Sequence, residues 1–162
     1  MPMQTVPALA MAFLHQAQAA AKNRVRGQKA AQEGDLRASG LFKALAEAQD
    51  IHAKKTLLYL RGRIEDTAHN EAEALQETRE LFVDSLEWTI LALAEGDKPA
   101  TALLTQMART LKSHMDLASA EAGVLYVCSI CGHIHAAQDE AGGPGRCPVC
   151  QAVPEKFTRV AA

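Results

Sequence analysis

The chain has 162 residues, of which 48% are apolar and only 4% aromatic, a composition that suits one main globular domain with a small module attached. Seventeen basic and nineteen acidic residues give a formal net charge of -2, without an arginine-rich stripe or a lysine run. We therefore expect no nucleic-acid partner. The N-terminal segment lacks an early positive region and an apolar stretch of spanning length, so we also expect no membrane partner and a cytoplasmic location.

Alanine and leucine dominate between positions 7 and 122, and both residue types favour helices. Apolar periodicity predicts four long helices joined by short connections: about Pro7 to Glu33, Asp35 or Ser39 to Gly62, Asn70 to Gly96, and Pro99 to Gly123. Gly34 suits the left-handed turn that ends a helix, and Asn70 and Glu73 have the spacing of a capping box. Four such helices predict a mainly α fold with a four-helix bundle over residues 1–123.

The sequence changes character at Val124. Tyr126, Val127 and Ile134 favour strands, and the run Gly142-Gly143-Pro144-Gly145 is incompatible with a helix. We therefore predict a second, small β domain over residues 124–162.

All four cysteines of the chain lie in this second domain, as two C-x-x-C pairs: Cys128, Cys131, Cys147 and Cys150. In a reducing compartment such pairs indicate a metal site rather than disulfides. Each pair can direct two sulfurs to one ion while amide groups of the turn donate to the thiolates. The ligand set predicts a tetrahedral site for one iron or one zinc ion.

The wider pattern around the cysteines, YVCSICGHIH followed by RCPVCQAVPEKF, resembles the C-terminal rubredoxin-like domain of rubrerythrins. The resemblance implies one iron that cycles between ferrous and ferric states, with zinc as the alternative because a zinc ribbon uses the same ligands. Gln151 stands where the family usually has a glycine, so this turn must obtain its left-handed residue in another way. Four thiolates fill a tetrahedral site, so His133 and His135 are expected to be exposed or structural.

The resemblance extends over nearly the whole chain and implies a ferritin-like bundle, in which related proteins hold two irons with glutamates and Glu-x-x-His pairs. The segments AFLHQAQA, AEAQDIHAKK and ARTLKSHMD match this pattern, but three glutamate positions carry Gln16, Gln49 and Leu111. An amide or a leucine provides no negative charge between two cations that repel each other. We therefore expect a degenerate bundle site, without the di-iron cluster and the peroxide reduction that depends on it.

Four ligand-type residues remain at matching positions: His52, Glu77, Glu80 and His114. Two imidazoles with carboxylates are an ordinary ligand set for first-row metals, so the bundle could bind one iron, zinc or manganese ion. In the alternative it holds no metal, and a glutamate pairs with a protonated histidine.

Three functions remain open at this point. The first is one-electron transfer through a four-cysteine iron, which requires a redox partner protein such as a reductase. The second is a peroxide-reducing, rubrerythrin-like oxidoreductase with an altered metal centre, and the third is a non-redox scaffold with a structural zinc ribbon. The resemblance further implies a homodimer, in which exchange of helices between subunits is an option.

Overall fold

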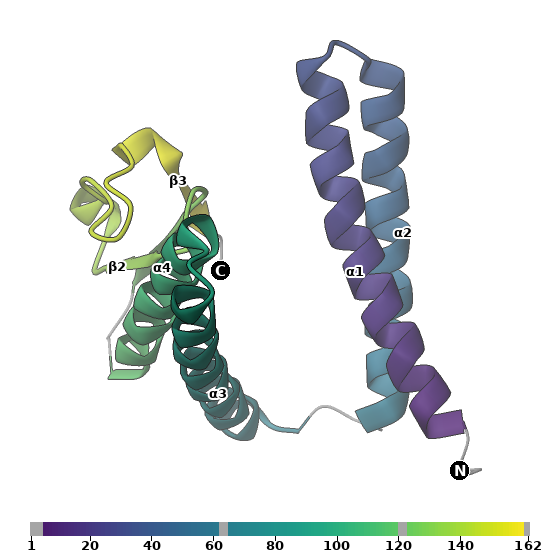
Figure 1. Cartoon of the computed structure of the whole chain (residues 1–162), viewed down its shortest axis with the longest axis horizontal. Coiled ribbons are helices and arrows are strands. Elements are labelled where there is room, and N and C mark those ends of the chain that lie inside the picture. Colours follow the sequence, from purple (N-terminus) through teal and green to yellow (C-terminus); the bar gives the residue numbers. More distant parts are fainter. Residues whose placement is uncertain (1–4, 62–64, 120–122, 161–162) are drawn as a thin grey trace. The chain divides into compact units, whose positions relative to one another are not determined.

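The computed structural model describes residues 5–61, 65–119 and 123–160. The chain forms two compact units, Met1–Asp66 and Thr67–Ala162, and each is described by itself below (Figure 1).

The first unit is a helical hairpin formed by α1 (Thr5–Gln32) and α2 (Leu36–Arg61). Small side chains at helical spacing are buried along both helices: Ala20, Asn23, Gly27 and Ala30 in α1, and Ser39, Ala46 and Ala53 in α2. Small residues allow two helix backbones to come close, and the Ser39 hydroxyl donates to the Gly27 carbonyl at 3.0 Å. Figure 1 shows the two helices side by side along their length.

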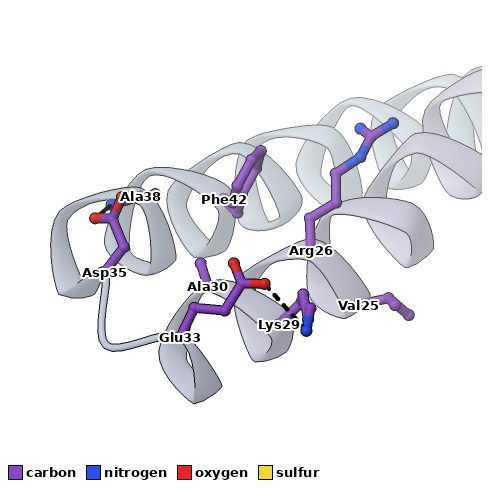
Figure 2. Close-up of a pocket in the computed structure, with 8 residues that line it drawn as sticks. All are labelled: Val25, Arg26, Lys29, Ala30, Glu33, Asp35, Ala38 and Phe42. Atoms are coloured by element: carbon purple, nitrogen blue, oxygen red, sulfur yellow. Dashed lines mark hydrogen bonds and ion pairs between the residues drawn. The ribbon is translucent and has the colours of Figure 1, made fainter.

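A glycine and an aspartate connect α1 to α2. Gly34 has a φ of 81°, a left-handed conformation that glycine adopts without a steric penalty. Asp35 then caps α2, because its carboxylate accepts from the Ala38 N–H at 2.8 Å. Beside this turn lies an open pocket of about 380 Å³, at whose edge Lys29 and Glu33 form an ion pair of 3.0 Å (Figure 2).

The second unit begins with another hairpin, α3 (Thr67–Ala94) and α4 (Lys98–Met115). Its turn repeats the first one: Gly96 has a φ of 73°, and the Asp97 carboxylate accepts from the Ala100 N–H at 2.9 Å. The four predicted helices are thus present, and in both hairpins a left-handed glycine is followed by a capping aspartate.

Two predicted helix ends are wrong. α3 begins at Thr67, so Asn70 lies inside the helix and cannot be the cap of a capping box. α4 does not continue to Gly123, because its α-helical part ends at Met115 and a 3₁₀ turn (η1, Asp116–Ser119) follows. The predicted end of the second helix, Gly62, lies outside the described residues.

The second unit ends in a three-stranded antiparallel sheet in the order β2-β1-β3. The strands are β1 (Val124–Cys128), β2 (Ile134–Ala137) and β3 (Phe157–Val160), with short 3₁₀ turns at Glu140–Gly142 (η2) and Pro154–Lys156 (η3). Gly123 precedes β1 and must be a glycine, because an added Cβ would lie 2.1 Å from the Gln138 carbonyl oxygen. The β structure therefore begins where the sequence predicts it.

The compact units divide the chain after Asp66, whereas the predicted domains are 1–123 and 124–162; those domain bounds remain a prediction. Within the described residues, no helix is both long and apolar enough to cross a membrane.

Candidate metal centre

The four cysteine sulfurs gather at one end of the sheet. All four Sγ atoms lie within 4.8 Å of one another. The Cys128 and Cys150 sulfurs are 3.7 Å apart, and those of Cys131 and Cys147 are 3.5 Å apart. An ion with four bonds of about 2.3 Å in tetrahedral geometry places its sulfurs about 3.8 Å apart. The observed spacing fits one iron or zinc ion and is too long for disulfide bonds.

Each C-x-x-C pair forms a knuckle, defined here as residues 128–133 for the first and 147–152 for the second. In the first, the Cys128 N–H donates to the His133 carbonyl and the Gly132 N–H donates to the Cys128 carbonyl, both at 2.9 Å. In the second, the Cys147 N–H donates to the Ala152 carbonyl and the Gln151 N–H donates to the Cys147 carbonyl, again both at 2.9 Å. The two knuckles are therefore equivalent in their backbone hydrogen bonds.

In the second knuckle, Gln151 itself adopts the left-handed conformation that the turn requires. Its φ is 62°, and the equivalent Gly132 has a φ of 79°. Within the described chain, Gln151 is the one residue other than glycine with a positive φ. The second turn thus has the same geometry as the first, at the steric cost that a side chain adds in this region.

Backbone N–H groups aim at the sulfurs and alter the pKa of individual thiols. At Cys147, burial acts to raise the pKa, but hydrogen bonds from the N–H groups of Cys150 and Val149, together with those from the Cys131 and Cys150 thiols, outweigh it and bring the pKa down to about 7. Burial raises the pKa of Cys131 despite a hydrogen bond from the His133 N–H, and it raises the pKa of Cys150 despite one from the Ala152 N–H. The N–H groups stabilise thiolates, the form that binds a metal.

The first cysteine of each pair is shielded from solvent and the second is not. Cys128 and Cys147 are 1% and 0% exposed, whereas Cys131 and Cys150 are half-buried. Ile130, at the tip of the first knuckle, is 57% exposed. The centre therefore has a buried side and a partly exposed side.

Three histidines surround the first knuckle. His133 is buried, and its Nδ1 lies 3.0 Å from the Ser113 hydroxyl of α4. His114, also in α4, has its Nε2 at 2.9 Å from the Gly132 carbonyl oxygen. His135 has its Nε2 at 3.1 Å from the Gly142 carbonyl oxygen. Burial, followed by the positive charges of His114 and His135, lowers the pKa of His133. His133 and His135 thus have structural contacts, and neither belongs to the sulfur cluster.

The four predicted bundle ligands are divided between the two units. Among the residues that the structure describes, the cysteines form the one cluster of metal-ligating groups. His52 lies exposed on α2 in the first unit; Glu77, Glu80 and His114 belong to the second unit. The Glu80 carboxylate accepts from Gln76 at 3.0 Å. A site made of these four residues therefore remains a prediction.

At one of the three changed positions, the structure shows what the substituted side chain does. The Gln49 amide oxygen accepts from the Nδ2 group of Asn23 at 2.9 Å, and Asn23 Oδ1 accepts from Arg26 at 2.8 Å. Asn23 is only 4% exposed, so Gln49 satisfies a buried polar group. Sequence reasoning missed Asn23, although an asparagine amid the apolar positions of α1 was a detectable signal.

Comparisons with known proteins agree with this geometry. Residues 126–158 match the family described as rubrerythrin, rubredoxin-like domain. A structure of nigerythrin in a mixed-valent state is 21% identical and covers 96% of this chain and 86% of its own, with a TM-score of 0.51. A structure of partially reduced nigerythrin is 20% identical over the same shares, with a TM-score of 0.52. No curated protein sequence matches the chain.

These likenesses show the fold class, which is mainly α: a four-helix bundle followed by a small three-stranded sheet domain with a cysteine cluster. The predicted resemblance is thereby confirmed.

Proposed function

Because the chain carries, at residues 126–158, the rubredoxin-like domain of the rubrerythrin family, we propose that it transfers single electrons through an iron held by Cys128, Cys131, Cys147 and Cys150. The bound iron would supply the change between ferrous and ferric states. The sulfur spacing of 3.5 and 3.7 Å, which fits a tetrahedral ion, is the observation that supports this most directly.

The protein's own residues prepare the site for this task. Backbone N–H groups donate to Cys131, Cys147 and Cys150, and such bonds favour the negatively charged sulfurs of a metal centre. The half-buried Cys131 and Cys150 bring the centre to the surface, where a partner protein can exchange electrons with it. The buried side at Cys128 and Cys147 keeps water from half of the ligand shell.

We further propose that the bundle site is degenerate. Gln49 is engaged with Asn23 inside the first hairpin, and neither Gln49 nor Leu111 can carry the negative charge that two neighbouring cations need. The residual set His52, Glu77, Glu80 and His114 would then hold at most one iron, zinc or manganese ion. Peroxide reduction through a di-iron cluster is not part of the proposal.

The partners proposed are a reductase, as electron donor, and a second copy of the chain. Both follow from the likeness to rubrerythrins. Light scattering of the purified full-length protein tests the dimer, because a monomer mass at micromolar concentration would contradict it.

The decisive experiment is elemental analysis of protein expressed with excess iron and purified without oxygen. We expect about one iron per chain, visible absorption after air oxidation, and loss of that absorption on uptake of about one electron per iron. Cys147→Ser should abolish normal iron binding, whereas Ser129→Ala, in the same domain but not a ligand, should retain it. A colourless protein with one zinc per chain would contradict electron transfer and favour the scaffold function.

A measurement of peroxide turnover distinguishes the proposed electron transfer from the remaining alternative, a peroxide-reducing enzyme with an altered metal centre. The proposal predicts no turnover above that of free iron when a one-electron donor and hydrogen peroxide are supplied. Turnover that disappears in Glu77→Ala, with the four-cysteine iron intact, would instead establish a peroxidase with an altered centre.

A further inference from the structure

A side chain of α4 is connected to a metal-ligating sulfur through a single peptide group. The Nε2 atom of His114 lies 2.9 Å from the Gly132 carbonyl oxygen. A carbonyl can only accept, so Nε2 carries the proton and donates. On the other side of the same peptide bond, the His133 N–H donates to the sulfur of Cys131. The imidazole, the peptide and the sulfur thus form a continuous chain of hydrogen bonds.

The second knuckle repeats this arrangement. The guanidinium of Arg146 donates to the Gln151 carbonyl at 3.2 Å, and the N–H across that peptide bond, from Ala152, donates to the sulfur of Cys150. Gly132 and Gln151 are equivalent in the two knuckles, and so are Cys131 and Cys150. The half-buried sulfurs of Cys131 and Cys150 therefore each accept from a peptide N–H, and the carbonyl of that peptide accepts a hydrogen bond from a basic side chain, His114 or Arg146.

The neighbouring residue of α4 holds the first of these peptides in place. The Ser113 hydroxyl donates to the Thr110 carbonyl at 2.7 Å, so its oxygen accepts from Nδ1 of His133 at 3.0 Å. Consecutive residues of α4 thus bind both residues of the Gly132–His133 peptide. The N–H of His133 is aimed at Cys131 by contacts from outside the knuckle.

We propose that His114 and Arg146 are positioning residues that set the reduction potential of the four-cysteine iron by polarising the Gly132–His133 and Gln151–Ala152 peptide groups. A hydrogen bond to a carbonyl strengthens the N–H donor of the same peptide, because hydrogen bonds in a chain polarise one another. Stronger N–H donors stabilise charge on the sulfurs and favour the ferrous state, which carries one more negative charge than the ferric state. This inference rests on the proposed function only in taking iron as the metal.

The redox test uses iron-loaded, full-length protein held at one applied potential. We expect His114→Ala to lower the ratio of ferrous to ferric iron about threefold, which is about 28 mV for a one-electron couple that shifts 59 mV per tenfold change. Arg146→Ala should lower it in the same direction, and His114→Gln, which keeps a donor, should restore part of the loss. The matched control is His135→Ala, because His135 donates to the Gly142 carbonyl, whose peptide does not lead to a cysteine.

A second readout does not depend on iron. In the zinc-loaded protein, proton NMR should show a weaker hydrogen bond at the His133 amide in His114→Ala and at the Ala152 amide in Arg146→Ala, each variant leaving the other amide unchanged. A general loss of structure would move both amides. The inference is overturned if the two amides do not respond in this crossed pattern, or if His135→Ala changes the iron ratio as much as His114→Ala. Because the NMR test uses zinc, it can succeed or fail whatever the native metal is.

Discussion

Gly132 and Gln151 occupy equivalent positions in the two knuckles, and both have a left-handed backbone, with φ values of 79° and 62°. A glycine at position 151 removes the steric penalty of a side chain there, which is on the order of 1 kcal/mol. We predict that Gln151→Gly raises the free energy of unfolding of the zinc-loaded protein by about that amount. Denaturant unfolding measures it, and the reverse change, Gly132→Gln, should lower it. If Gln151→Gly destabilised the protein, the side chain of Gln151 would have a favourable role that outweighs the strain.

Two glycines of the first hairpin provide a matched pair. An added Cβ meets no atom within 4 Å at either Gly34 or Gly40, so the backbone conformation alone decides the outcome. Gly34→Ala should destabilise by about 1 kcal/mol, because Gly34 has a positive φ. Gly40→Ala, inside α2, should stabilise by about 0.5 to 1 kcal/mol. Thermal unfolding followed by circular dichroism compares the two, and shifts of the same sign would refute the explanation.

The hydrogen bond between Asn23 and Gln49 is predicted to stabilise the first hairpin. Gln49→Leu leaves the buried Nδ2 group of Asn23 without this acceptor and should cost about 1 to 3 kcal/mol. Gln49→Glu keeps an oxygen at the same distance along the side chain and should cost clearly less. Guanidinium unfolding of both variants is the measurement. Equal losses would mean that the amide oxygen of Gln49 contributes nothing to stability.

Metal binding should release fewer protons at pH 8 than at pH 6. The pKa of Cys147 is lowered to about 7, so this thiol is protonated at pH 6 and mostly a thiolate at pH 8. Burial raises the pKa of Cys131, so Cys131 must lose its proton on binding at either pH. Zinc binding to the metal-free protein should therefore release about one proton fewer at pH 8. Calorimetry in buffers of different ionisation enthalpy counts the protons, and an equal count at both pH values would exclude a low pKa at Cys147.

The cysteine centre could be predicted because residues close together in the sequence determine its structure. A C-x-x-C pair forms a knuckle from its own backbone hydrogen bonds, so the spacing of Cys128, Cys131, Cys147 and Cys150 is enough to predict the ligand set. The helices followed from apolar periodicity, and the turns at Gly34 and Gly96 from the preference of glycine for a positive φ.

The errors lie where contacts are distant or where signals compete. Nothing in the sequence stops α4 at Met115, since the residues after it are helix formers, but Ser113 and His114 bond to His133 and Gly132, about twenty residues further on. At the start of α3, the first turn, Thr67 to Asn70, has no large apolar residue, so periodicity does not distinguish a cap near Asp66 from one at Asn70. The peptide-linked roles of His114 and Arg146 were also beyond sequence reasoning, because they depend on hydrogen-bond directions.

The two Gly-Asp turns, Gly34-Asp35 and Gly96-Asp97, have a consequence for the order in which parts of the protein fold. Each hairpin is closed by contacts between residues close in the chain, and such local structure forms rapidly. The sheet domain has little apolar core of its own and must bring Cys128 and Cys150 together around a cation. The helices should therefore assemble without waiting for metal, whereas the sheet domain should gain most of its stability when the ion binds. Chelated protein should accordingly keep its helical circular dichroism, and amide hydrogen exchange should show that chelation lowers the stability of residues 124–160 more than that of the helices.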